Sequence, residues 1–119
     1  MNKNYKIEMA TSGFRIAQPN QPPFEISWQE ITRIVAHEID LLTTDLACFD
    51  IEAEQSNNLR TFTVHEEAEG FDLLDAELGR VLTGYNSIWR HKIIQPPFAP
   101  NRTTIYESTT NSPIDRPTS

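Results

Sequence analysis

The segment DLACFDIEAEQSNNLRTFTVHEE, residues 45–67, decides the predicted fold of this 119-residue chain. Its first half alternates between apolar and polar residues, and neighbouring side chains of a strand point to opposite faces. One face is then formed by Ala47, Phe49, Ile51 and Ala53. The other face carries Cys48, Asp50, Glu52 and Glu54. Residues 55–58 have the composition of a hairpin turn, and alternation resumes over 60–67 with Phe62 and Val64 inward. The segment therefore predicts an antiparallel hairpin with one buried face.

Shorter alternating runs precede this hairpin. Residues 5–9 and 14–18 flank a turn at 11–13 and predict a first hairpin, and Phe24 and Ile26 predict a brief strand. Residues 27–30 are typical of a turn or a single helical turn, and a long strand is expected over about 31–40. Several antiparallel strands are thus predicted before the chain reaches its helical region.

The apolar period changes from two residues to three or four near residue 70. Phe71, Leu74, Leu78 and Val81 then share one face, so we predict an amphipathic helix over about 70–83. Residues 86–107 are too apolar for a free tail but contain three prolines, which predicts an extended arm that packs back on the domain. We predict one domain over residues 1–107 and a disordered tail over 108–119, where core residues are lacking.

Strands followed by one amphipathic helix indicate an α+β fold, in which the helix caps a curved antiparallel sheet or open barrel. This order, with the tryptophan of ISWQEITRI (26–34) before a long strand, resembles that of bacterial pleckstrin-homology-like domains over about 24–83. More narrowly, the chain is similar over about 24–106 to a group of small bacterial proteins. The similar features are the tryptophan of SWQEI, the stretches DLLTTD and EEAEGF, and a tail of the form W…PPFAPNRTTIY. The resemblance implies a stand-alone domain with no cofactor. Together with the residue pattern it predicts a pleckstrin-homology-like domain with one C-terminal amphipathic helix and an extended C-terminal arm. It brings no established reaction or ligand.

Negative charge is concentrated in the middle of the chain. Residues 38–77 hold twelve acids and one base, Arg60, which gives −11, whereas the whole chain carries −7. Phosphate backbones and anionic lipids are repelled by such a segment, so neither a nucleic acid nor a membrane is expected as a partner. The first hairpin also offers only Lys3, Lys6 and Arg15, in place of the basic cluster of phosphoinositide-binding domains. A basic protein would be attracted to this charge, unless the charge serves solubility alone.

Signatures of catalysis and metal binding are weak. His37–Glu38 and His65–Glu67 have ligand types that suit zinc, but adjacent strand residues point to opposite faces and no HExxH motif is present. Cys48 lies among carboxylates, which raise the pKa of a thiol and make it less reactive. No P-loop, G-x-S-x-G or dinucleotide-binding fingerprint occurs. We therefore expect no catalytic residue, no metal and no cofactor.

The single cysteine excludes an intramolecular disulfide and favours a reducing compartment. The sequence shows no apolar signal-peptide region and no run of about 20 apolar residues. A cytoplasmic protein is the simplest expectation.

These observations favour a non-enzymatic protein-binding domain. One form would be a bacterial immunity protein or inhibitor whose acidic surface blocks a cationic toxin. The residues expected to contact the partner are Glu38, Asp40, Asp45, Asp50, Glu52, Glu54, Glu66, Glu67, Trp89 and Phe98. The two aromatic residues are alternatively core residues, as is expected for Trp28. Two other functions stay open: a small-molecule or peptide sensor in which the arm closes over a pocket, and a metal-dependent hydrolase. A homodimer through a strand edge or the arm is compatible with all three.

Overall fold

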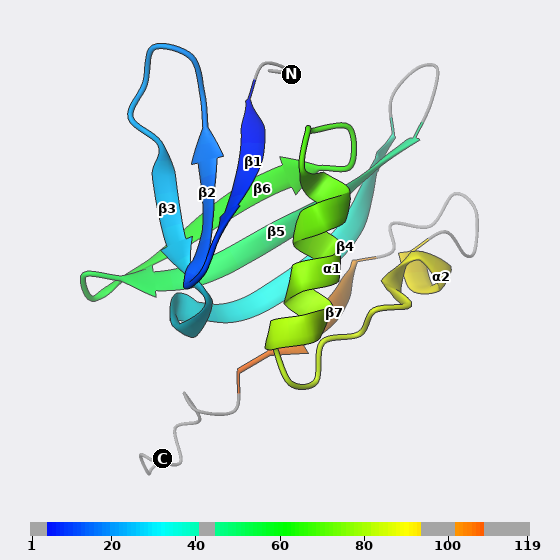
Figure 1. Cartoon of the computed structure of the whole chain (residues 1–119). Helices are drawn as coiled ribbons and strands as arrows, with labels where there is room; N and C mark the ends of the chain where they lie inside the picture. Colours follow the sequence, from blue (N-terminus) through cyan, green and yellow to red (C-terminus); the bar gives the residue numbers. More distant parts are fainter. Residues whose placement is uncertain (1–4, 41–44, 94–101, 109–119) are drawn as a thin grey trace, which may run out of the picture.

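The computed structural model describes residues 5–40, 45–93 and 102–108, without the side chains of residues 40, 45, 91 and 92. The chain order combines strands with short helices, as expected for an α+β fold (Figure 1). The elements are β1 (Lys6–Ala10), β2 (Gly13–Ala17), β3 (Phe24–Ser27), η1 (Trp28–Glu30), β4 (Ile31–Asp40), β5 (Asp45–Gln55), β6 (Asn58–His65), α1 (Phe71–Val81), α2 (Trp89–Ile93) and β7 (Thr103–Glu107). The predicted strand over about 31–40 is confirmed, and the predicted turn at 27–30 is the 3-10 helix η1.

The strands form two open antiparallel sheets. The three-stranded sheet has the order β1-β2-β3, and the four-stranded sheet has the order β6-β5-β4-β7. Figure 1 shows the three-stranded sheet and α1 next to each other in front of the four-stranded sheet. We call the side of the four-stranded sheet that meets α1 its inner face, and the opposite side its outer face. One hydrophobic core fills the space between these layers.

The β5–β6 hairpin forms as its alternation predicts. A two-residue turn joins the strands, with Ser56 at φ 52° and Asn57 at φ 66°. Positive φ at both central residues matches the right-handed twist of the flanking strands and closes the hairpin tightly. The predicted inward residues of β5 are Ala47, Phe49, Ile51 and Ala53, and each is at most 4% exposed. The inner face of the sheet is therefore set by this segment.

Helix α1 covers that inner face through Phe71, Leu74 and Leu78, which are all buried. The helix starts beside β1, where the Ile7 amide donates to the Glu69 carbonyl at 2.8 Å. Gly70 makes this approach feasible: it has φ 93°, and a Cβ added there would lie 2.1 Å from the Ile7 carbonyl oxygen. A side chain at this position would strain the backbone and push the helix away from β1.

Two parts of the predicted architecture are wrong. The strands do not close into a barrel, because each sheet ends in edge strands that do not pair with the other sheet. The amphipathic helix is not C-terminal either, since α2 and β7 follow it. Strand β7 pairs with β4, and its buried Ile105 joins the core. The predicted extended arm over 86–107 thus contains a helix and a strand in its described parts, while residues 94–101 lie outside the description.

Trp89 is the largest fully buried side chain of the described residues. Its ring is 0% exposed and packs edge-on against Phe49, with the ring centroids 4.9 Å apart, and against Phe71 at 6.2 Å. Its indole Nε1–H donates to Asp75 Oδ1 at 3.0 Å, and the Tyr85 hydroxyl donates to the same oxygen at 2.6 Å. Asp75 therefore fastens the segment after α1 to the helix.

We predict that Asp75→Ala destabilises the protein by about 2 kcal/mol, because a buried donor left without an acceptor costs about 1–3 kcal/mol. Urea denaturation monitored by tryptophan fluorescence measures the loss. Asp75→Asn is the matched control, since its carbonyl oxygen still accepts both hydrogen bonds, and it should lose less stability. Equal losses in the two variants would contradict the role given to these bonds.

We also predict opposite effects for two glycine substitutions. Gly70→Ala should lower the free energy of unfolding by at least about 2 kcal/mol, because it combines positive φ with a backbone clash. Gly79→Ala should raise it by about 0.5–1 kcal/mol, since Gly79 lies inside α1 and the added Cβ would make ordinary contacts with the Tyr85 ring at 3.6 Å and with Ser87 Cβ at 4.0 Å. Thermal and urea unfolding of both variants test the pair. A neutral Gly70→Ala would refute the constraint.

Candidate functional site

The outer face of the four-stranded sheet brings together three of the predicted contact residues. Asp50, Glu52 and Glu54 alternate with the buried residues of β5 and therefore project away from α1. By register, Asp50 lies between Val35 of β4 and Thr63 of β6, and Arg33 lies opposite Glu52. In the described chain, both helices contribute their buried side chains to the core on the other side of the sheet.

Asp50 is the most strongly held carboxylate on this face. Thr63 donates to its Oδ1 at 2.7 Å, and Arg102 donates to its Oδ2 at 3.0 Å. His37 Nε2 lies 3.2 Å from the same Oδ2, but it is not aligned as a hydrogen bond, so we treat this contact as an electrostatic one. Partial burial alone would raise the pKa of Asp50, but these three neighbours outweigh it and lower the pKa. Asp50 is therefore ionised and already paired.

The charge of the outer face is smaller than the sequence suggests. Glu52 pairs with Arg33 at 3.0 Å, and Asp50 pairs with Arg102. Glu54 is exposed, and none of the described cations lies within ion-pair distance of it. Three carboxylates of β5 thus face two guanidinium groups, which leaves a local charge of −1 centred on Glu54.

The other predicted acidic residues lie elsewhere, so the expectation of one acidic surface is wrong. Glu66 follows β6, where its carboxylate accepts from the Ala47 amide at 2.9 Å and from Arg90 at 2.8 Å. Glu67, which is exposed, comes next in the chain. Glu38 is in register with Ala47, so its side chain leaves the backbone on the inner side of the sheet. Strand alternation and the position of α1 divide the acids between the two sides of the sheet. The side chains of Asp40 and Asp45 lie outside the described residues.

Trp89 is not an exposed anchor, which corrects its place among the predicted contact residues. It is fully buried, because Phe49 and Phe71 supply an apolar site and Asp75 satisfies its only polar atom. Ile93 and Ile105 are buried with it. The described part of the arm thus contributes these three side chains to the core, while the prolines that motivated a closing arm lie in residues 94–101, outside the described residues. Phe98 lies outside the described residues. Among those residues, no helix is long and apolar enough to cross a membrane.

His37, Cys48 and His65 lie in one row across β4, β5 and β6. Sequence alone could not show that the two histidines flank the cysteine. Cys48 is buried, and its burial, followed by the charges of Asp50 and Glu66, raises its pKa to about 11. Its thiol is therefore protonated at neutral pH and is a poor nucleophile. Within the described residues, no group of three or more His, Cys, Asp or Glu side chains is arranged to hold a metal ion.

His65 is engaged by Tyr5 from the start of the chain. The His65 backbone amide donates to the Tyr5 hydroxyl at 2.8 Å, and that hydroxyl lies 2.7 Å from His65 Nδ1. The hydroxyl accepts from the amide, and the tautomer of His65 decides whether the hydroxyl or the ring N–H is the donor in the bond to Nδ1. Burial also lowers the pKa of His65. This pair ties residue 5 to the end of β6, and the lowered pKa favours the uncharged form of His65 in the folded protein.

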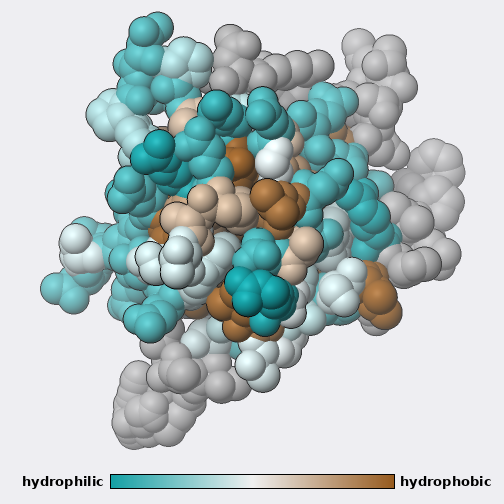
Figure 2. All heavy atoms as spheres, viewed as in Figure 1, coloured by the Kyte–Doolittle hydropathy of each residue, from teal (hydrophilic) through white to brown (hydrophobic). Residues whose placement is uncertain are grey.

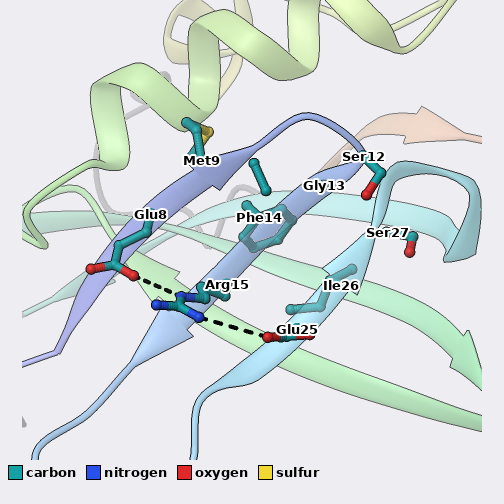
Figure 3. Close-up of a pocket in the computed structure, with 10 residues that line it drawn as sticks. Glu8, Met9, Ser12, Gly13, Phe14, Arg15, Glu25, Ile26 and Ser27 are labelled. Atoms are coloured by element: carbon teal, nitrogen blue, oxygen red, sulfur yellow. Dashed lines mark hydrogen bonds and ion pairs between the residues drawn. The ribbon is translucent and has the colours of Figure 1, made fainter.

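The described part of the chain has two surface hollows of note. The first, which we call the hairpin hollow, has a volume of about 300 Å³ and is lined by residues 8–10, 12–15 and 25–27 of the three-stranded sheet. Figure 3 shows Arg15 of this hollow reaching Glu8 on one side and Glu25 on the other, at 2.7 and 3.7 Å. Its guanidinium is thus already paired with two carboxylates.

The second hollow, which we call the edge hollow, has a volume of about 260 Å³. It lies between the three-stranded sheet and β6, and its lining residues are Tyr5, Ile16, Gln18, Phe24, Arg60, Thr61, Phe62 and Thr63. No sequence pattern predicts it, because its walls come from segments far apart in the chain. The sequence feature that indicates a distinct role at the edge hollow is Arg60, the single base between residues 38 and 77.

We predict that stability falls as the pH drops from 7.5 to 5. A histidine with a lowered pKa binds fewer protons in the folded than in the unfolded state, so protonation below about pH 6.5 favours unfolding. The lowered pKa of Asp50 acts only at more acidic pH, so it does not mask this window. His65→Gln should flatten the dependence in urea denaturation at several pH values, because glutamine can accept from Tyr5 without titrating. An unchanged slope in that variant would refute the assignment.

The chain has been compared with protein-family models, with curated proteins and with solved structures, and none of the three comparisons finds a match. Its function must therefore be inferred from the fold and from the contacts of its own residues.

Proposed function

We propose that this protein is a non-enzymatic protein-binding domain that contacts a basic partner through the outer face of its four-stranded sheet. The observation that carries the proposal is the exposed Glu54, which makes no ion pair with a described cation and lies on the same sheet face as Asp50 and Glu52. Thr61 and Thr63 of β6 are also exposed and extend this face beyond the acidic strand. Val35 and Cys48 on the same face are buried, so the exposed polar groups around Glu54, Thr61 and Thr63 are the part of the face that favours contact with a folded protein.

The electrostatics give the partner its sign. The chain carries −7 overall, and residues 38–77 carry −11. Opposite charge steers a partner toward a surface and raises the association rate constant, an effect that added salt weakens. The arginine pairs on Asp50 and Glu52 reduce the local charge, so long-range steering comes from the whole molecule while Glu54 supplies a direct contact.

One concrete form of this function is an immunity protein or inhibitor that covers the active cleft of a cationic bacterial toxin, such as a nuclease. The protonated thiol of Cys48 and the engaged ring of His65 support binding over catalysis at this face. We also propose that residues 24–83 are related to pleckstrin-homology-like domains, since several strands are followed there by α1. A toxin gene with a delivery domain directly beside this gene would support the immunity role.

Co-purification from the native host at low and high salt tests the proposal. We expect a basic protein to be recovered at low salt and released at high salt. With the purified partner, Glu54→Lys should lower the association rate constant about three- to tenfold. The matched control is Asp72→Lys, which makes the same charge change at an exposed position of α1.

Three outcomes would contradict the proposal. Recovery of no protein partner at low salt would argue against a binding role. An equal effect of both substitutions would show that net charge alone, and not the outer face, steers the partner. A larger effect of Asp72→Lys would move the interface to the helix side of the molecule.

A further inference from the structure

The free edge of β6 presents backbone groups whose direction can be deduced from the register. The His65 amide donates to the Tyr5 hydroxyl, so it points away from β5. Backbone groups alternate in direction along a strand of an antiparallel sheet. The amides and carbonyls of Leu59, Thr61 and Thr63 therefore also point away from β5. Among the described residues, no strand pairs with this edge of the sheet.

The edge hollow lies directly against these free groups. Thr61 and Thr63 line it from β6, and Ile16 and Phe24 line it from the three-stranded sheet. Phe24 packs on Phe62 with the ring centroids 5.6 Å apart, which gives the hollow an aromatic wall. A volume of about 260 Å³ is below the range of about 300–1,000 Å³ that is typical of small-molecule pockets, and suits one large side chain.

Arg60 adds a positive charge at the same place. Its guanidinium carbon lies 5.7 Å from the Phe24 ring centroid and 5.3 Å from the Phe62 ring centroid. Its one described polar contact is a long hydrogen bond of 3.4 Å to the amide oxygen of Gln55, and it makes no ion pair with a described carboxylate. The Phe24 and Phe62 rings thus contact the exposed guanidinium of Arg60, whose N–H groups can donate to a carboxylate of a partner.

We propose that the edge hollow binds an extended peptide that pairs with β6 as an added strand. The free groups of Leu59, Thr61 and Thr63 would supply main-chain hydrogen bonds, which give affinity for any sequence. A large apolar side chain of the peptide enters the hollow between Ile16, Phe24 and Phe62, and an acidic side chain next to it pairs with Arg60. The partner class is therefore an extended segment that carries an apolar and an acidic residue.

A second copy of this chain is a poorer occupant. Two β6 strands can pair about Thr61, but each would bring its own three-stranded sheet to the same side of the joined strands. Phe24 and Ile16 of one copy would then compete with those of the other for the space above β6. A single strand without a covering sheet meets no such obstruction. This binding site adjoins the outer-face site of the proposed function at Thr61 and Thr63, but it uses Arg60 and the free strand edge in place of Glu54.

A phage-displayed library of random ten-residue peptides, selected on the purified full chain, tests the inference. We expect selected peptides to alternate in hydrophobicity and to share a large apolar residue near an aspartate or glutamate. A synthetic selected peptide should protect the amides of Leu59, Thr61 and Thr63 from hydrogen exchange. Methylating alternate backbone nitrogens of the peptide should weaken binding with a two-residue period, a readout that does not depend on any variant folding.

Two variants of the protein sharpen the test. Thr61→Pro removes one outward amide that the fold does not use, and proline is tolerated on such an edge, so binding should weaken about tenfold with little change in stability. Arg60→Glu should weaken the acidic peptide by a similar factor, whereas Arg60→Lys keeps the charge and should retain most of the affinity. Asp72→Asn, at an exposed position of α1, is the control and should leave peptide binding unchanged.

The inference is overturned if the selection yields no binding peptide, or if the selected peptide protects amides outside β6. It is also overturned if the protein sediments as a dimer that Thr61→Pro dissociates, because the edge then belongs to a second copy.

Discussion

The packing of Phe49, Phe71 and Trp89 around one another is the interaction on which the rest of the structure depends. Phe49 comes from the centre of the four-stranded sheet, Phe71 begins α1, and Trp89 begins α2. Three segments that are distant in the chain are thus joined by tilted and edge-on ring contacts, which are worth about 0.5–1.5 kcal/mol each beyond their buried area. Asp75 completes this arrangement because it satisfies the polar atom that a buried tryptophan brings with it. The orientation of α1, and with it the choice of inner and outer face, follows from this cluster.

Local patterns in the sequence predicted the elements that depend on local constraints. The alternation around Phe49 and Ile51 correctly indicated β5 and its buried face, and the spacing of Phe71, Leu74 and Leu78 indicated α1 to within two residues at each end. The position of the C-terminal segment could not be predicted in this way. Its prolines suggested an extended arm, whereas the pairing of β7 with β4 depends on contacts between residues more than 60 positions apart. The open barrel, one of the two predicted sheet arrangements, was also incorrect, since barrel formation depends on the register and twist of all strands together.

The distribution of charge shows the same limit. The twelve acids between residues 38 and 77 give that segment a net charge of −11, but they do not form one surface. The acids of β5 project from the outer face of the four-stranded sheet, whereas α1 carries its acids on the inner side. Arg33 and Arg102 approach the carboxylates of β5 from β4 and from the segment before β7, and neither pairing is visible in the local sequence. Figure 2 shows hydrophilic residues over most of the face that carries α1, with apolar residues in small groups near its middle. The ion pairs of Arg33 and Arg102 thus leave fewer unpaired carboxylates on β5 than a count of the acids suggests.

The late arrival of β7 in the chain has a consequence for how the protein is made. During synthesis, β4 through β6 leave the ribosome well before residue 107. The edge of β4 that later pairs with β7, between Arg33↔Glu107 and Ala36↔Thr103, is therefore unpaired at first. The β5–β6 hairpin needs only a two-residue closure and forms rapidly, whereas β7 must close a loop of many tens of residues. Throughout that interval the nascent sheet exposes two open edges, the β4 edge and the β6 edge, and an open edge is a template for pairing with other chains. The interval between emergence of β6 and docking of β7 is thus the period in which the growing polypeptide is most exposed to aggregation.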